Sequence, residues 1–370
     1  MPLNTIPNEG LTSRGYPSDR ITTPIIINGD MQVAQRGTSQ TSITSNGYYT
    51  IDRIKTAINN GGTWTQSQST EVPSGQGFAK SLKMDCTVAD TSLASGDFLH
   101  LQIPIEAQNL QSLKYGTSSA ETLTLSFWVK SNKTGTYCIS LQKSDNTRYD
   151  FVSEYSISSA DTWEKKTITI TPDSQIKASA GAIDNDNGEG LKLKYILLSS
   201  GRTGTNNTWN SSTPADCTSN QVNLADSTSN EWYITGIQLE IGEFDSTSIP
   251  SFPFESFENN LRKCQRYFQF VHSVVGTSDA SSNWRGIAPL NPEMRASPSI
   301  SLTGNYEITD GYSADFTSSD STSINLITNT GSNKRIFPQI QSFSGLTAGR
   351  TYFSPRYHTN DEYIEVDAEL

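Results

Sequence analysis

The sequence predicts an all-β protein built around a jelly-roll β-sandwich. Three observations lead to this class: alternating apolar and polar residues in five separate segments, a high content of Ser and Thr, and almost no helical periodicity between the segments. Alternation at period two is typical of a strand with one face in a core and the other in water. Strands at this density favour two packed antiparallel sheets. The five segments are Ile25 to Gly37, Gly77 to Met84, Thr122 to Lys130, Trp163 to Pro172 and Trp232 to Gly242.

Segment 122–130, TLTLSFWVK, shows the alternation most clearly. A strand here turns successive side chains to opposite faces of its sheet. The expected core-facing residues are Leu123, Leu125, Phe127 and Val129, and the expected solvent-facing residues are Thr124, Ser126 and Trp128. Segment 163–172 repeats the pattern, with Ile168 and Ile170 alternating with threonines.

Composition agrees with this class and excludes several functions. Ser and Thr number 51 and 42 of 370 residues, and hydrophobic residues make up 34%. The net charge is 27 − 38 = −11 and no Lys/Arg run could follow a phosphate backbone, so nucleic acid is excluded as a partner. No apolar stretch reaches the ~18 residues of a membrane span. The N-terminus lacks the pattern of a signal peptide, and we expect assembly in a cytoplasm.

The chain divides into four parts. Residues 1–24 are rich in proline and carry no sustained period, so we expect an extended arm that docks on a neighbouring subunit or a larger assembly; packing on its own domain is the alternative. The jelly roll is predicted over 25–245, a linker with a short helix over 246–266, and a small C-terminal β-sandwich over 267–370.

The linker carries the one helical stripe in the sequence. Ser256 can cap a helix in which apolar residues recur at i, i+4, i+7 and i+11. These residues are Phe257, Leu261, Cys264 and Phe268. We expect this helix to pack on a core with that face.

The four cysteines show no CxxC pair and no histidine at metal-ligand spacing. We interpret them as buried free thiols rather than as a disulfide or a zinc site. They are Cys86, Cys138, Cys217 and Cys264.

Several segments resemble known families. The five strand segments are similar to the jelly-roll carbohydrate-binding modules of polysaccharide-degrading enzymes. A longer combination resembles bacteriophage virion proteins of the tail fibre or receptor-binding type, common in marine phages, and covers about residues 20 to 305. Its motifs are NGDMQVAQRGTS (28–39), GYYTIDR (47–53), PFESFENNLRKCQRYF (253–268) and MRASPSISLTG (294–304).

The resemblance implies a non-enzymatic bacteriophage structural protein located in the virion. We expect a homotrimeric tail fibre or receptor-binding component that contacts host surface polysaccharide, and that binds other virion proteins through the arm. A capsid-bound head fibre or decoration protein is one alternative. The sugar-binding module of a polysaccharide-acting enzyme is a second, and it predicts a fused catalytic domain.

Calcium is a candidate cofactor at two places. The enzyme-linked modules commonly hold Ca²⁺ between the opening and closing strands; this sequence keeps Asp30 but has Thr235 and Gly236 where those modules tend to carry carboxylates. A hard cation needs six to eight oxygen ligands. A second set, Asp184, Asp186 and Glu189 in IDNDNGEG, has calcium-loop chemistry but lacks a distal glutamate, and a solvated turn is the alternative.

No catalytic constellation is found in the sequence. GxSxG, HExxH and Walker A motifs are absent, and nothing nominates a pair of carboxylates. The three histidines, His100, His272 and His358, lie in unrelated strand-like segments, and we interpret each as a structural or surface residue.

Sugar recognition needs exposed aromatic faces with polar neighbours. Trp209, Trp64 and Trp284 lie in polar surroundings and are the candidate sugar contacts; the alternative is that each fills the edge of its own sandwich. Trp128, Trp163 and Trp232 lie inside strands and are expected to be structural.

We further expect the arm to anchor the protein, and the Trp209 loop and the C-terminal unit to face the host. The aromatic residues that motivate this in the C-terminal unit are Trp284, Tyr306, Tyr312, Tyr352 and Tyr357.

Overall fold

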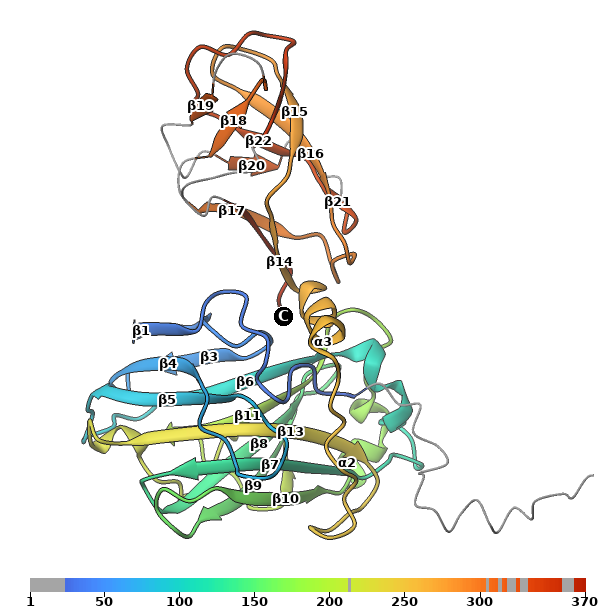
Figure 1. Ribbon diagram of the computed structural model, residues 1–370. Coiled ribbons are helices and arrows are strands. Elements are labelled where there is room, and N and C mark those ends of the chain that lie inside the picture. The colour runs from blue at the N-terminus through green and yellow to red at the C-terminus, as the bar shows by residue number, and fades with distance from the viewer. Residues whose placement is uncertain are drawn as a thin grey trace, which may run out of the picture.

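The computed structural model describes residues 24–211, 214–303, 306–311, 315–317, 324–326, 332–354 and 363–370. Its regular structure is almost all antiparallel β-sheet, which confirms the predicted fold class. A large β-sandwich forms the lower part of the molecule, and a smaller C-terminal unit stands on it (Figure 1). Residues 1–23 of the N-terminal arm lie outside the described residues, as do Tyr312, Tyr357 and His358.

Within the described residues, two sheets form the large sandwich. The six-stranded sheet has the order β1 (Ser39–Ile43), β4 (Thr63–Ser69), β5 (Ser81–Val88), β13 (Glu231–Ile241), β7 (Leu123–Ser131) and β10 (Glu164–Ile170). The seven-stranded sheet has the order β12 (Thr208–Asn210), β9 (Tyr149–Ile157), β8 (Gly135–Lys143), β11 (Glu189–Ser199), β6 (Phe98–Glu106), β3 (Lys55–Asn59) and β2 (Gly47–Tyr48).

The core of the sandwich lies between these sheets, as the β7 alternation predicts. All four core-facing β7 side chains are completely buried. Phe127 makes edge contacts with Tyr195 and Tyr155, with ring centroids 5.0 and 5.1 Å apart. The opposite face of β7 was expected to meet water, and this is wrong for Thr124 and Ser126, which are buried. The chain that follows β13 covers Thr124, whose hydroxyl donates to the Gly242 carbonyl at 2.7 Å.

The C-terminal unit has a second core between two further sheets. One contains β14 (Phe268–Val271), β24 (Tyr363–Asp367) and β17 (Ser299–Thr303). The other contains β19 (Asp315–Thr317), β18 (Glu307–Thr309), β23 (Thr351–Phe353), β15 (Val275–Ser278), β16 (Trp284–Pro289), β22 (Pro338–Ile340) and β20 (Ile324–Leu326), with β21 (Arg335–Ile336) paired to β16. Trp284, Tyr306 and Tyr352 are buried in this core.

Helices are few and short in the described chain. They are α2 (Ser174–Lys177), α3 (Phe257–Gln265) and the 3₁₀ turns η1 (Ala107–Leu113), η2 (Ser179–Gly181) and η3 (Leu224–Asp226). Helix α3 begins as predicted, because the Ser256 hydroxyl accepts from the Asn259 amide at 3.3 Å. Its buried face agrees with the predicted stripe at Cys264 and Phe268, which are buried. The stripe is wrong at Phe257, which is 53% exposed, and the polar Asn260 is buried instead.

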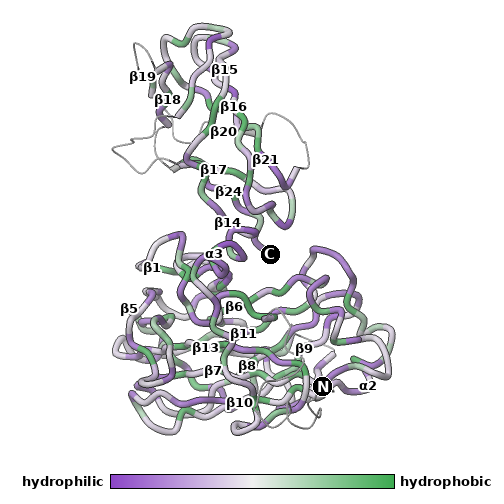
Figure 2. The backbone as a smooth tube through the Cα atoms, turned by 45° about the vertical axis from the view of Figure 1, so that its right-hand side comes forward, coloured by the Kyte–Doolittle hydropathy of each residue, from purple (hydrophilic) through white to green (hydrophobic). Residues whose placement is uncertain are grey.

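One further expectation is confirmed. All four cysteines are free and buried. The hydropathy of the chain alternates along the strands and gathers into no long apolar segment (Figure 2). Among the described helices, none has the length and apolarity to cross a bilayer.

Shortening Phe127 tests the core. Phe127→Ala should lower the free energy of unfolding by about 3–5 kcal/mol, because it leaves a cavity among packed rings. Urea denaturation followed by circular dichroism measures this. Thr41→Ala, at an exposed position of β1, should stay within about 0.5 kcal/mol of the wild type. Equal effects in the two variants would contradict the placement of Phe127.

Candidate functional site

The three predicted sugar-contacting tryptophans are all buried. Trp64 and Trp284 are 0% exposed and Trp209 is 2% exposed. Trp64 donates its indole N–H to the Gly61 carbonyl at 2.8 Å, and Trp209 donates to the Thr171 carbonyl at 3.0 Å. Trp284 lies 6.0 Å from the buried ring of Tyr306. No indole face is open to a ligand, so the sugar-contact interpretation of these residues is corrected to the alternative, a packing role.

The same burial corrects the expected host-facing surface. Trp209 lies in β12, which pairs with β9 and places the indole 5.4 Å from Phe151. In the C-terminal unit, Tyr306 and Tyr352 are fully buried. None of these rings can present a surface to a host.

The carboxylate of the first calcium candidate is hydrogen-bonded to protein amides, and calcium binding stays a prediction. The Asp30 carboxylate accepts from the side-chain amides of Gln32 at 2.6 Å and Asn260 at 3.1 Å, and burial raises its pKa. Thr235 donates its hydroxyl to the Lys80 carbonyl. Two side-chain amides therefore donate to the Asp30 carboxylate, whereas a bound Ca²⁺ would need several oxygen ligands.

The carboxylates of the second calcium candidate likewise form hydrogen bonds and an ion pair within the protein. Glu189 accepts from the Ser144 hydroxyl at 2.6 Å and pairs with Lys192 at 3.0 Å. Asp186 accepts from the Gly188 amide at 2.8 Å. Across the described residues, no group of three or more His, Cys, Asp or Glu side chains could hold a metal ion.

His100 lies in β6 of the large sandwich, and His272 follows β14 of the C-terminal unit. Burial lowers the pKa of His100 to about 3, so its ring is neutral at physiological pH. His272 is exposed beside Tyr363, with ring centroids 5.8 Å apart.

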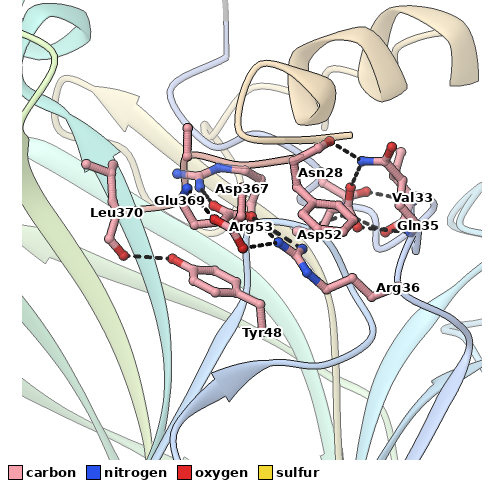
Figure 3. Close-up of polar contacts among 12 residues, drawn as sticks. Asn28, Val33, Gln35, Arg36, Tyr48, Asp52, Arg53, Asp367, Glu369 and Leu370 are labelled. Atoms are coloured by element: carbon pink, nitrogen blue, oxygen red, sulfur yellow. Dashed lines mark hydrogen bonds and ion pairs between the residues drawn. The ribbon is translucent and has the colours of Figure 1, made fainter. Parts of the chain in front are cut away.

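The polar contacts with most structural consequence join the C-terminal strand to the large sandwich. Arg53, only 2% exposed, forms an ion pair with Glu369, which is 4% exposed. Arg36 contacts Glu369 at 3.4 Å and Asp367 at 3.3 Å. The Tyr48 hydroxyl donates to the Leu370 carbonyl at 3.0 Å. Figure 3 shows how these residues of both units converge on the chain end.

Both arginines also lie over aromatic rings of the C-terminal unit. The Arg53 guanidinium carbon lies 3.4 Å from the Tyr267 ring centre, and that of Arg36 lies 3.5 Å from the Phe268 ring centre. Burial acts to lower the pKa of Arg53, but the Glu369 carboxylate, together with smaller contributions from neighbouring groups such as Tyr267 and Tyr48, outweighs burial and raises the pKa. Arg53 therefore stays charged and satisfies Glu369 within the interface.

A second group of contacts holds β14 against the same edge of the sandwich. The Gln35 side chain donates both to the Asp52 carboxylate and to the Phe268 carbonyl. Arg266 donates to the buried Glu106 carboxylate at 3.0 Å. These contacts fix the position of the smaller unit relative to the larger one.

An open groove of about 720 Å³ lies between the large sandwich and the C-terminal unit. This groove is our candidate binding site. Both units contribute aromatic and polar side chains to it. From the large sandwich the lining residues are Arg36, Gln40, Asn46, Gly47, Tyr48, Tyr49 and Lys55; from the C-terminal unit they are Phe268, Phe270, Tyr363, Glu365, Asp367, Glu369 and Leu370.

Alternation in β14 and β24 builds the C-terminal wall of this groove. Ile364 and Val366 face the second core, which turns Tyr363 and Glu365 to the opposite face. Phe270 pairs with Glu365 across the strands and so shares that face. The Phe270 and Tyr363 rings are half-buried with centroids 4.2 Å apart. They form an aromatic pair beside carboxylates.

Sequence reasoning missed this site although part of its signal was present. The segments RYFQFV and EYIEVDAEL alternate apolar and polar residues, which predicts strands. Alternation alone does not show that the two segments are neighbours, nor that 47–55 lies opposite them. The groove depends on contacts between residues more than 300 positions apart, such as Arg53 and Glu369.

No known protein-family model matches the chain, and no curated protein sequence matches it. Among solved structures, the enzymatically active domain of bacteriophage CBA120 tailspike protein 4 matches 59% of this chain and 21% of that chain, at 11% identity and a TM-score of 0.29.

Carbohydrate-binding modules also match. The family 11 module from Clostridium thermocellum, in complex with a mixed-linked tetrasaccharide, covers 56% of this chain and 98% of its own, at 15% identity and a TM-score of 0.26. A family 16 carbohydrate-binding module covers 47% and 84%, at 16% identity and a TM-score of 0.23. TM-scores of this size assign no function to the chain.

Removing Arg53 should loosen the interface. Arg53→Met is expected to cost about 2–4 kcal/mol of unfolding free energy, because Glu369 loses its main partner while still buried and keeps only Arg36. Replacing both residues, as Arg53→Met with Glu369→Leu, should recover most of that loss. The exposed pair Arg285–Asp279 provides the control, since Arg285→Ala should cost less than about 1 kcal/mol. Chemical denaturation measures all of these, and an Arg53→Met variant as stable as the control would contradict the interface.

Asp52 should make stability depend on pH. Burial raises its pKa from 3.8 to about 6, although Gln35 and Arg36 act to lower it. Between about pH 4 and 6 the folded state therefore binds a proton that the unfolded chain has released, and the unfolding free energy falls as pH rises. Asp52→Asn should remove this component, about 1–3 kcal/mol over the window. Denaturation of both proteins from pH 4 to 7 checks it, and parallel pH profiles would contradict the assignment.

Proposed function

We propose that this chain is a non-enzymatic carbohydrate-binding protein whose site is the groove between the large sandwich and the C-terminal unit. The observation that carries the proposal is the half-buried Phe270–Tyr363 pair, with ring centroids 4.2 Å apart, in a groove that both units line. Aromatic faces beside fixed polar groups are the surfaces on which sugar rings stack.

The remaining lining residues supply hydrogen bonds for sugar hydroxyls. Glu365 and Asp367 lie next to the aromatic pair, and Lys55 lies across the groove with its ammonium 5.6 Å from the Tyr48 ring centre. The groove is open, so it suits a segment of a longer polysaccharide rather than an enclosed small molecule.

Within this function, we place the protein in a bacteriophage particle as a homotrimeric tail fibre or receptor-binding component facing host glycans. The support is the combined sequence resemblance over about residues 20 to 305. A capsid-bound head fibre or decoration protein, and the sugar-binding module of a polysaccharide-acting enzyme, remain the alternatives. Immunogold labelling of particles distinguishes tail from head, and a catalytic domain in the same polypeptide identifies the module.

A glycan array with groove variants tests the proposal. The glycans of interest are those on the array that the wild-type protein binds. Phe270→Ala and Tyr363→Ala should each weaken binding of these glycans by about tenfold, since each removes a stacking surface. Tyr363→Phe keeps the ring face and should bind within about threefold of the wild type.

Phe353 offers a matched control, because it is a 40% exposed phenylalanine of the C-terminal unit outside the groove. Phe353→Ala should leave glycan binding unchanged. Circular dichroism confirms that each variant is folded. If Phe270→Ala and Tyr363→Ala bind these glycans as tightly as the wild type does, the groove is not the binding site.

A further inference from the structure

Lys55 differs from the other cation that lines the groove in its contacts. Arg36 contacts Glu369 at 3.4 Å and Asp367 at 3.3 Å. Across the described residues, no carboxylate oxygen lies within 4.0 Å of the Lys55 ammonium, and no acceptor forms a hydrogen bond with it. Its recorded contact is with the Tyr48 ring, whose centre lies 5.6 Å away. Lys55 therefore brings an uncompensated positive charge to the groove.

The strand neighbours of Lys55 carry no charge that compensates its ammonium. Lys55 lies in β3, between Tyr48 of β2 and Gln102 of β6 in the strand register. Its side chain is half-buried. An ammonium group has three hydrogen-bond donors, and its partial burial without acceptors is unfavourable. A ligand that brings a negative charge to this place removes that cost.

A lysine on the same sheet face has the carboxylate that Lys55 lacks. Lys192 of β11 pairs with Pro104 of β6, two residues from Gln102, which pairs with Lys55. Both lysines therefore point to the outer face of the seven-stranded sheet. Lys192 is 20% exposed and contacts Glu189 at 3.0 Å. The fold thus supplies a counter-charge for Lys192, which lies outside the groove lining, and not for Lys55.

The carboxylates of the groove already have partners in the protein. Glu369 contacts both Arg53 and Arg36. Asp367 contacts Arg36 and accepts from the Glu369 backbone amide at 2.8 Å. Glu365 accepts from a serine hydroxyl at 3.0 Å. Of the charged groups at the groove, the ammonium is therefore the one that a ligand has to match.

Side-chain charges at the groove balance, although the whole protein is acidic. Three cations and three carboxylates give 3 − 3 = 0, against −11 for the whole chain. They are Arg36, Arg53, Lys55, Glu365, Asp367 and Glu369. The excess negative charge lies elsewhere, and physiological salt screens exposed charges beyond about 8 Å. An anionic ligand in the groove thus meets no net charge of its own sign.

Aromatic rings connect Lys55 with the aromatic pair on the opposite wall. The Tyr48 ring centre lies 5.6 Å from the Lys55 ammonium and 5.2 Å from the Arg36 guanidinium carbon. That guanidinium lies over Phe268, whose ring centroid is 4.9 Å from that of Phe270. Phe268 is buried beneath the groove, whereas Tyr48 and Phe270 are half-buried. A ligand that contacts both the aromatic pair and Lys55 has to cross the groove, which requires more than one sugar unit.

We propose that the ligand of the groove is an acidic polysaccharide, with a negatively charged sugar at Lys55 and another sugar of the same chain stacked on Phe270 and Tyr363. This inference rests on the proposed function of the groove and names its ligand class. A lysine ammonium is a point charge that pairs with carboxylate, sulfate or phosphate groups. Sugar rings supply the apolar faces that stack on the aromatic pair. A neutral polysaccharide leaves the Lys55 ammonium without a counter-charge.

Matched pairs of immobilised polymers test the ligand class. Polygalacturonate, alginate and hyaluronate are each compared with their methyl-esterified forms, and dextran sulfate with dextran, in about 0.15 M salt. The wild-type protein should bind the acidic member of at least one pair about tenfold more tightly than the neutral member. Lys55→Met should remove this preference and leave binding of the neutral member unchanged. Lys55→Arg keeps the charge and should bind the acidic member within about threefold of the wild type.

Lys80→Met is the matched control, because Lys80 is half-buried and lies outside the groove lining. It should keep the wild-type preference. The proposal is overturned if the wild type prefers no acidic polymer, if Lys55→Met keeps the preference, or if Lys80→Met loses it equally. Phe270→Ala separates these results from a failure of the groove itself. If that variant binds both members of a pair more weakly, the groove remains the carbohydrate site whatever its charge preference; if it binds both as the wild type does, the proposed function is wrong as well.

Discussion

The buried ion pair between Arg53 and Glu369 is the contact on which the arrangement of the molecule depends. It joins residues from the first and last parts of the chain in an environment where neither charge is in water. Burying two charges is costly unless they are paired and well hydrogen-bonded. Arg53 meets that condition by also donating to the Pro104 carbonyl at 2.7 Å and stacking on Tyr267. The pair is satisfied only in one relative position of the two units, so it specifies that position.

The groove is a consequence of this position. Each wall of the groove belongs to a unit with its own hydrophobic core. Neither wall forms a groove by itself. Arg36 connects them most directly, because it contacts Glu369 and Asp367 while lying over the Phe268 ring. A ligand that touches both walls would therefore meet preorganised side chains, and preorganisation reduces the entropy lost on binding.

Much of the fold could be predicted from the sequence, whereas the exposure of individual aromatic residues could not. The alternation in 122–130 correctly placed four side chains in the core, because one face of a sandwich strand is buried; they are Leu123, Leu125, Phe127 and Val129. The exposure of the second face depends on segments distant in sequence. Trp209 lies among polar residues but is buried, because β12 pairs with β9 and brings it against Phe151. Trp128 lies in a regular strand and is half-buried, whereas Thr124 on the same face is covered by the chain after β13.

The groove keeps its aromatic rings at the surface only through the contact between the two units. Phe270 and Tyr363 lie on strands whose other face packs the small core, and the groove above them is bounded on its far side by the large sandwich. Each unit has a hydrophobic core of its own. Loosening the Arg53–Glu369 pair should therefore disturb the groove while both cores stay packed, so the stability of each unit and the geometry of the groove depend on different interactions.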